Sequence, residues 1–383
     1  MNKFSHLAAR CDHLILIPSL ALSLTGIVCL YAITRESDSS LGTGFMTFLS
    51  REVMIQSAAL VIGLTAAAAI LMLGYRYFID LEKIIYILSL FLLLLVYIPG
   101  LGTSVNGSRS WISLGFITFQ PSEAVKITFI ILMSSYLSRS IHGISCSQSS
   151  GGGFPESWDI LKAALYGLPF ILLVAKEDFG SGCVFCAIWI FMVFCSGLQL
   201  RIIVRLAMVI IILLPMFYFF LAGYQKDRID AFLEPNDLDL PGNYQVWNSK
   251  VAIGSGGLFG KGLTGGTQST LGFLPVPESD FIFAAAVEML GFAGGISIIA
   301  MFALIIYRSL KAARYAKDIQ GALVAAGMTG MFFFQSFENI AMTMGLMPVT
   351  GITLPFLSYG GSSMLASWIG VGLLLSVSCR QKL

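Results

Sequence analysis

The segment Phe281-Ile-Phe-Ala-Ala-Ala-Val-Glu288-Met-Leu-Gly-Phe-Ala-Gly-Gly-Ile-Ser-Ile-Ile-Ala-Met-Phe-Ala-Leu-Ile-Ile-Tyr307 holds a single ionisable carboxyl among 27 residues. A helix needs about 20 mainly apolar residues to cross a bilayer, so this segment is long enough to span one. Nine further apolar stretches occur, at 14–34, 53–73, 83–101, 121–138, 159–175, 180–200, 202–223, 319–342 and 364–379. Together they predict an all-α polytopic membrane protein with about ten transmembrane helices.

The composition of the whole chain indicates the same class. Of the 383 residues, 56% are hydrophobic and 11% are charged, whereas soluble domains carry about 25% charged residues. This excludes an ordinary water-soluble enzyme, a disordered chain and a disulfide-stapled secreted scaffold. The net charge of +2 is too small to indicate a nucleic-acid surface, so no nucleic-acid partner is expected.

Lys and Arg predict the orientation, because they are enriched in cytoplasmic loops. If the N-terminus lies in the cytoplasm, 14 of the 23 Lys and Arg residues fall in cytoplasmic segments. Ten spans then place both termini in the cytoplasm and the longest connection, 224–280, outside. We expect residues 1–383 to form a single transmembrane domain with this large extracytoplasmic loop between helices 7 and 8.

Ionisable residues inside spans are functional candidates, because a charge at the bilayer centre costs about 2.5–3.5 kcal/mol. Four acidic residues fall in or beside spans: Glu123, Asp178, Glu288 and Glu338. Lys126 follows Glu123 by three residues, which places both on one helix face. The two side chains form either an ion pair that joins helices or a polar wall of a substrate cavity.

The segment 224–280 contains the glycine-rich run Gly254-Ser-Gly-Gly-Leu-Phe-Gly-Lys-Gly262, followed by Gly265-Gly-Thr-Gln268. The run is similar to a phosphate-binding loop, but it lacks the Walker spacing and has Gly262 where Ser or Thr is required. Its backbone N–H groups could hold phosphate or sugar. Equally, the glycines could only allow the loop to lie close against helix ends.

Asp280 ends the run Pro275-Val-Pro-Glu-Ser-Asp280, directly before the long apolar segment. One interpretation is a helix N-cap, which Asp favours. The other is a reactive carboxylate. All three histidines map to the cytoplasmic side, so acid–base chemistry outside would depend on carboxylates, chiefly Asp280, Glu278 and those near 227–239.

Several long motifs resemble the SEDS (shape, elongation, division and sporulation) family over nearly the whole chain. They include Asn106-Gly-Ser-Arg109-Ser-Trp111, Phe119-Gln-Pro-Ser-Glu-Ala-Val-Lys126, Gly266-Thr-Gln268, Asp280-Phe-Ile-Phe-Ala284 and Leu354-Pro-Phe-Leu-Ser-Tyr-Gly-Gly-Ser-Ser363. The Gly-Lys-Gly and Gly-Thr-Gln runs are closer to the elongation branch, RodA, than to the division branch, FtsW.

The resemblance implies a peptidoglycan glycosyltransferase in the cytoplasmic (inner) membrane. It would polymerise lipid II into glycan strands on the outer face during cell-wall elongation and release undecaprenyl pyrophosphate. It also implies a divalent cation (Mg²⁺ or Mn²⁺). A class B penicillin-binding protein and other membrane proteins of the elongation machinery would be its partners.

By the same resemblance, Asp280 corresponds to the catalytic aspartate and is the candidate metal ligand. Glu123 and Lys126 correspond to the intramembrane pair, and Asp178 to the acid that follows the fifth helix. Arg109, Lys126 and Arg228 are expected to face the anionic leaving group. Further candidates for substrate binding or support are Trp111, Gln120, Ser122, Lys261, Gln268, Glu278, Glu288 and Ser358.

The chain departs from the family pattern before Asp280, where Val276, Glu278 and Ser279 replace the common Glu, His and Thr. Two other functions stay open. One is a flippase that carries lipid II across the bilayer, for which Asp280 would matter little because it lies at the membrane boundary. The other is a non-catalytic scaffold that recruits a penicillin-binding protein.

Overall fold

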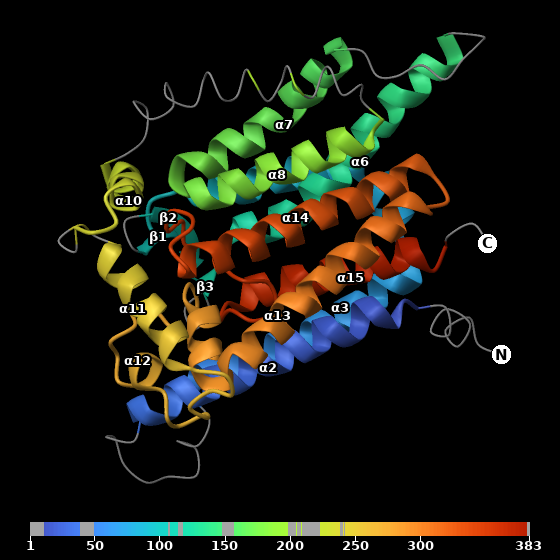
Figure 1. The fold of residues 1–383 in the computed structure, drawn as a ribbon. Coiled ribbons are helices and arrows are strands. Elements are labelled where there is room, and N and C mark those ends of the chain that lie inside the picture. Colours follow the sequence, from blue (N-terminus) through green and yellow to red (C-terminus); the bar gives the residue numbers. More distant parts are fainter. Residues whose placement is uncertain are drawn as a thin grey trace.

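The computed structural model describes residues 11–38, 50–105, 108–113, 118–147, 157–197, 204, 208, 223–237, 240 and 242–380. Most of these residues are helical, and the long helices run side by side along one axis of the molecule (Figure 1). The helices are α2 (His13–Asp38), α3 (Arg51–Leu73), α4 (Tyr75–Asp80), α5 (Glu82–Leu95), α6 (Pro121–Ser147), α7 (Ser157–Glu177), α8 (Phe179–Cys195), α10 (Gly223–Leu233), α11 (Asn243–Ser255), α12 (Thr267–Thr270), α13 (Ile282–Arg314), α14 (Ile319–Thr343) and α15 (Gly361–Ser378).

Nine of the ten predicted spans coincide with helices in the described part of the chain, while the span 202–223 lies almost entirely outside it. Four helices, α2, α3, α13 and α15, are each long and apolar enough to cross a membrane alone, and α8 is a shorter apolar helix. The helical polytopic fold predicted from the apolar runs is therefore confirmed.

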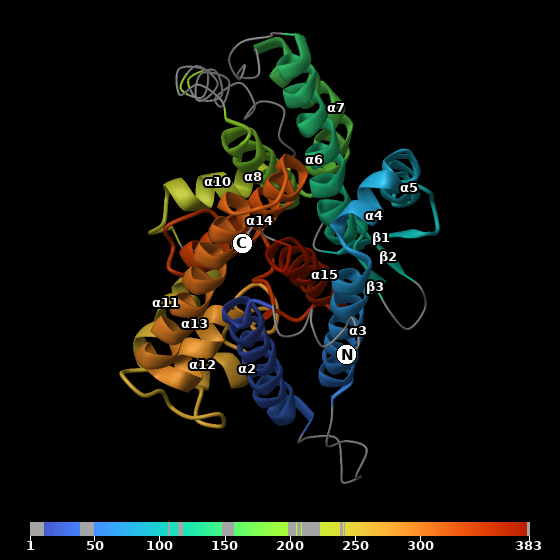
Figure 2. The ribbon, with the colours of Figure 1, turned by 90° about the vertical axis from the view of Figure 1, so that its right-hand side faces the viewer.

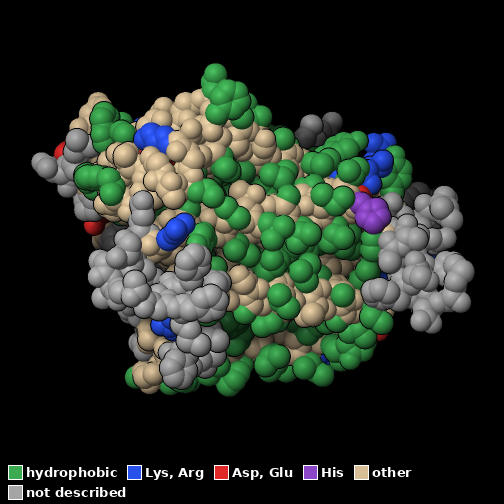
Figure 3. Space-filling model, turned by 90° about the horizontal axis from the view of Figure 1, so that it is seen from below, with side chains coloured by type: hydrophobic (Ala, Val, Ile, Leu, Met, Phe, Trp, Pro, Cys, Tyr) green, Lys and Arg blue, Asp and Glu red, His purple; other side chains and the backbone are tan. Residues whose placement is uncertain are grey.

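The outer helices present large hydrophobic side chains on the molecular surface. Ile62 of α3 is 56% exposed and Ile87 of α5 is 69% exposed. On the face drawn in Figure 3, hydrophobic side chains cover the middle, and Lys and Arg lie toward the two ends. Such an apolar surface is unfavourable in water but suits contact with lipid.

Helix α15 lies at the centre of the bundle, with α2, α3, α6, α13 and α14 around it (Figure 2). Its contact with α3 is so close that a Cβ added at Gly372 would lie 2.7 Å from the Ala67 Cα. Small residues let membrane helices approach in this way. Trp368 of α15 is fully buried and donates its indole N–H to the Ser23 hydroxyl at 3.2 Å.

A small antiparallel sheet, which the sequence analysis did not predict, follows α5. It comprises β1 (Gly102–Val105), β2 (Ser108–Ser113) and β3 (Thr118–Phe119) in that order. Thr103 pairs with Trp111, and Ile112 pairs with Phe119. This register brings Trp111 beside the chain that enters α6.

The connection 224–280 is also more ordered than a simple loop, because it contains α11, α12 and most of α10. These helices and the sheet lie together at one end of the bundle (Figure 1). At the other end, the Sγ atoms of Cys11 and Cys379 are 3.7 Å apart. The first and last described residues therefore lie on the same side of the bundle, as an even number of spans requires.

Candidate active site

A cavity of about 610 Å³ opens at the end of the bundle that carries the sheet. Part of its lining is apolar and comes from α3 and α15: Ile55, Ala58, Ala59, Ile62 and Leu365. Another part is charged or polar: Gln120, Asp178, Arg228, Glu278 and Asp280. A cavity with both kinds of wall suits an amphiphilic ligand.

Asp280 lies in the wall of this cavity, immediately before α13. The N-cap residue of α13 is Phe281, whose side chain makes no capping hydrogen bond. The carboxylate Oδ1 instead accepts a hydrogen bond from the Ser279 hydroxyl at 3.0 Å. The N-cap interpretation of Asp280 is therefore wrong, and Asp280 is instead one of the residues that line the cavity.

The backbone around Asp280 is held from several sides. The Asn339 amide donates to the Asp280 carbonyl at 3.0 Å, and the Ser358 hydroxyl donates to the Ser279 carbonyl at 2.6 Å. Val276 has a φ of +49°, which is rare for a β-branched residue and persists only where the surroundings impose it. Ser358, a predicted supporting residue, thus lies behind the loop and fixes it.

Arg228 of α10 reaches the same region. Its Nη1 donates to the Thr350 carbonyl at 2.8 Å. A Cβ added at Gly351 would lie 3.6 Å from Asp280 Oδ2 and 3.7 Å from Arg228 Nη1, so the two charged groups flank this glycine. Burial raises the pKa of Asp280, while the Ser279 hydrogen bond and the Arg228 charge lower it by less. A raised pKa is what a general base needs to accept a proton near neutral pH.

Asp178 and Gln120 form a second polar part of the wall. Asp178 caps α8, because its carboxylate accepts from the Ser181 backbone N–H at 3.0 Å and from the Ser181 hydroxyl at 2.7 Å. The Gln120 amide donates to the same carboxylate at 3.2 Å. Trp111 of β2 and Glu278 also line the cavity. Five other predicted site residues therefore line the same cavity as Asp280: Trp111, Gln120, Asp178, Arg228 and Glu278.

Glu123 and Lys126 form an ion pair within α6, with 2.8 Å between Lys126 Nζ and Glu123 Oε1. The two side chains are only 5% and 1% exposed, respectively. In the described part of the chain, the cavity lining includes neither residue, nor the buried Ser122 beside them. The structure therefore favours a buried structural pair over a wall of the substrate cavity.

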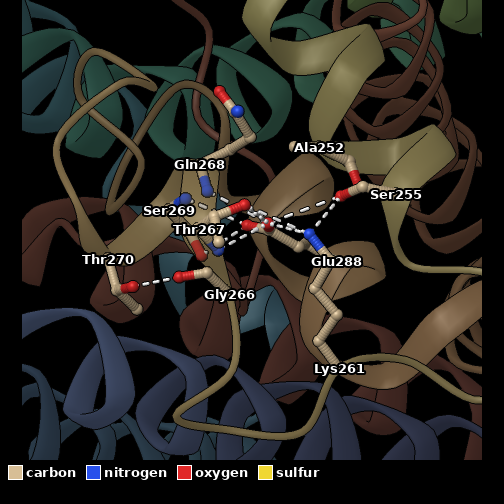
Figure 4. Close-up of polar contacts among 9 residues, drawn as sticks. All are labelled: Ala252, Ser255, Lys261, Gly266, Thr267, Gln268, Ser269, Thr270 and Glu288. Atoms are coloured by element: carbon tan, nitrogen blue, oxygen red, sulfur yellow. Dashed lines mark hydrogen bonds and ion pairs between the residues drawn. The ribbon is translucent and has the colours of Figure 1, made fainter.

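Glu288 is the centre of a separate polar cluster (Figure 4). Its Oε1 accepts from the backbone N–H groups of Thr267 and Gln268 at 2.8 and 3.0 Å. Its Oε2 accepts from the Ser269 N–H at 2.9 Å and from the Ser269 hydroxyl at 2.8 Å. Lys261 Nζ lies 3.1 Å from Oε1. The loop thus directs its donors to a carboxylate of the protein itself.

Close packing explains the glycines of this loop. The backbone N–H groups of Lys261 and Gly262 donate to the carbonyls of Glu288 and Met289, both at 3.0 Å. A Cβ at Gly260 would lie 2.1 Å from the Met289 carbonyl oxygen. The structure therefore supports the alternative in which the loop lies against a helix. It gives no support to binding of phosphate or sugar there, and it places Lys261, Gln268 and Glu288 in this cluster.

Some residues of the site were not selected from the sequence. Asn339 and Thr350 hold Asp280 and Arg228 through backbone carbonyls, which no residue pattern predicts. Glu338, which accepts a hydrogen bond from the Thr350 hydroxyl, was named from the sequence as an acidic residue in a span but was given no role in the site. Arg109 belongs to β2, but its side chain lies outside the described residues.

A divalent cation such as Mg²⁺ needs carboxylate or other oxygen ligands close to one point. Across the described residues, no group of three or more His, Cys, Asp or Glu side chains is placed to hold a metal. Single carboxylates of the cavity, Asp280 among them, fit the other mode of Mg²⁺ binding. In that mode, one or two carboxylates share the ion with phosphates of the substrate and with water.

Comparison with known proteins gives similarity over nearly the full chain. The family model described as cell cycle protein (FTSW_RODA_SPOVE) matches residues 12–383. Stage V sporulation protein E of Bacillus subtilis (strain 168) is 35% identical over 373 residues, which cover 96% of each chain. The peptidoglycan glycosyltransferase RodA of Treponema pallidum (strain Nichols) is 30% identical over 443 aligned positions, covering 97% of this chain and 98% of the relative.

The fold is similar to a solved structure described as "Structural coordination of polymerization and crosslinking by a peptidoglycan synthase complex". The TM-score is 0.78 at 28% sequence identity, over 96% of this chain and 97% of that chain.

Proposed function

Because the chain belongs to the SEDS family of FtsW, RodA and SpoVE proteins, we propose that it is a peptidoglycan glycosyltransferase that polymerises lipid II during cell-wall elongation. The observation that carries the proposal is the placement of Asp280 and Arg228 around Gly351, in a cavity that also has an apolar wall. Relatives of known activity, such as the RodA of Treponema pallidum, support the reaction class. Similarity to that RodA supports the elongation branch.

The reaction joins a sugar hydroxyl of one lipid-linked saccharide to the anomeric carbon of another. As the new C–O bond forms, the bond to the prenyl pyrophosphate breaks and the pyrophosphate leaves with the bonding electrons. The hydroxyl must lose its proton, and Asp280 is the carboxylate of the cavity that we assign as its acceptor. The pyrophosphate is already an activated leaving group, so the reaction needs no nucleotide.

Charge on the departing pyrophosphate needs a cationic partner in the cavity. Arg228 lines the cavity and is fixed by the Thr350 carbonyl, so it is the residue that we assign to this role. The apolar side chains of α3, such as Ile55 and Ile62, suit the prenyl chain of the substrate. Glu123 and Lys126 would act indirectly, by keeping α6 in place.

As an alternative to accepting the proton, Asp280 would hold a divalent cation, Mg²⁺ or Mn²⁺, together with the substrate's phosphates. When bound, such an ion would neutralise charge on the pyrophosphate. Arg228 would then bind the part of the pyrophosphate that the cation leaves free, and Asp178 would keep Gln120 oriented in the cavity wall.

The active end of the bundle, with the sheet and α10 to α12, would face the outside of the cytoplasmic membrane. Both termini would then lie in the cytoplasm, as the distribution of Lys and Arg predicts. The similar solved structure is a peptidoglycan synthase complex that couples polymerisation to crosslinking. We therefore propose a class B penicillin-binding protein as the partner that crosslinks the product, together with other membrane proteins of the elongation machinery.

Reconstitution with fluorescent lipid II and Mg²⁺ or Mn²⁺ tests this function. The purified chain with its partner should produce glycan polymer, and omission of the cation should reduce the yield. Polymer absent under every condition, together with lipid II translocation in vesicles, would favour the flippase. Polymer that depends on the partner's own activity, with this chain inert, would favour the scaffold.

A further inference from the structure

Helix α14 carries a buried acid, Glu338, next to the cavity but behind its lining. The residue is 0% exposed, and its Oε1 accepts a hydrogen bond from the Thr350 hydroxyl. Its Oε2 has no hydrogen-bond partner among the described residues. A fully buried carboxyl is unfavourable unless its polar atoms are used, so a purely space-filling role would be better served by an apolar side chain.

Thr350 connects this acid to the cavity. It lines the cavity, and its two polar groups point to different partners. The hydroxyl donates to Glu338, and the carbonyl accepts from Arg228 Nη1 at 2.8 Å. Arg228 comes from α10, outside the bundle of long helices. Its guanidinium is held by Thr350, and Thr350 is held in turn by Glu338.

The next residue of α14 supports Asp280 in a parallel way. The Asn339 amide donates to the Asp280 carbonyl at 3.0 Å and to the Ile352 carbonyl at 2.8 Å. Gly351 lies between Thr350 and Ile352 in the chain, and the charged groups of Asp280 and Arg228 are both close to it. Two adjacent residues of α14 thus hold the site: Glu338 binds Thr350, which holds Arg228, and Asn339 binds the backbone of Asp280.

We propose that Glu338 is a positioning residue of the glycosyl transfer, which fixes Thr350 and thereby holds the Arg228 guanidinium in the cavity beside Asp280. The inference rests on the proposed function, in which Arg228 binds the pyrophosphate of the lipid-linked donor. A guanidinium recognises phosphate through paired N–H donors, so its orientation matters as well as its charge. Without the tie, the Thr350 carbonyl is less fixed and the guanidinium is less well oriented for the leaving group.

The hydrogen bond and the charge of Glu338 can be separated by substitution. Glu338→Gln keeps an oxygen that accepts from Thr350 but removes the charge, whereas Glu338→Leu removes both. Thr350→Ser keeps the hydroxyl, and Thr350→Val removes it in a side chain of the same shape. The pair at position 350 decides the matter even if Glu338→Leu fails to fold.

The test measures kcat/KM for lipid II polymerisation by the purified chain with its partner, with thermal unfolding as a check of folding. Thr350→Val and Glu338→Leu should each lower kcat/KM roughly fivefold, the effect of one hydrogen bond. Thr350→Ser and Glu338→Gln should remain near the unmodified value. In an Arg228→Gln background, Thr350→Val should have no further effect, because both substitutions act through the same guanidinium.

Three outcomes would overturn the inference. One is a Thr350→Val variant as active as the unmodified chain. Another is a full additional loss from Thr350→Val in the Arg228→Gln background, which would indicate a general structural effect. The third is a Glu338→Gln variant as impaired as Glu338→Leu, which would indicate a role of the charge. An unmodified chain that makes no polymer would instead overturn the proposed function itself.

Discussion

Removal of Lys126 alone should be far more damaging than removal of the whole ion pair with Glu123. The two side chains are 1% and 5% exposed, and their charged atoms are 2.8 Å apart. Lys126→Met leaves the Glu123 carboxylate buried without its cation, which typically destabilises a protein by about 3–5 kcal/mol. Glu123→Gln with Lys126→Met removes both charges and should recover most of that loss, since neutral replacements of buried pairs are often tolerated.

The free energy of unfolding of the single and double variants can be measured with SDS in dodecylmaltoside micelles. A double-mutant cycle should give a coupling energy of at least about 2 kcal/mol, well above the roughly 0.5 kcal/mol seen for independent sites. The charge swap, Glu123→Lys with Lys126→Glu, serves as a control and should harm expression and activity less than Glu123→Gln alone. Additive single effects, or a swap worse than Glu123→Gln, would refute the structural pair.

Two other expectations follow from the geometry. Gly260→Ala should destabilise the protein by about 2 kcal/mol more than Gly262→Ala. Both glycines have a φ of +81°, so a side chain at either position costs a similar 1–2 kcal/mol, roughly, for the left-handed backbone. Only at Gly260 would the added Cβ also clash with the Met289 carbonyl oxygen, at 2.1 Å. Equal unfolding free energies for the two variants would contradict the close packing of this loop. A base must be deprotonated, so polymerisation should fall as pH drops through the raised pKa of Asp280. Arg228→Gln should move the acid limb of the kcat/KM pH profile to higher pH, because it removes a positive charge near Asp280. Glu278→Gln should move it to lower pH, because it removes a negative charge. A limb that is unmoved in both variants would exclude Asp280 as the titrating group.

The helices could be predicted from the sequence because apolar length is a local property. The runs at 281–307 and 319–342 predict α13 and α14 closely. The sheet was missed because its strands are short, and its register depends on pairing between Trp111 and Thr103 rather than on any periodic pattern. Local hydropathy carries no information about which strands pair or in which register.

The site was predicted unevenly for a related reason. Asp178 and Asp280 lie at the edges of apolar runs, so the residues themselves gave a signal. Arg228 was selected through the family resemblance, and the structure brings all three to one cavity. Lys261 and Glu288 carry equal signals but meet each other elsewhere. A sequence shows which buried charges need partners, but only the fold decides whether the partner is a substrate or another side chain.

The most direct test of the account compares Asp280→Asn with the unmodified chain and with Glu278→Gln, using fluorescent lipid II in the presence of the partner and a divalent cation. The account predicts that Asp280→Asn unfolds at an unchanged temperature and still binds lipid II, yet forms no polymer, whereas Glu278→Gln forms it. Polymer formed by Asp280→Asn at the rate of the unmodified chain would contradict the central claim that this carboxylate takes the proton of the attacking sugar.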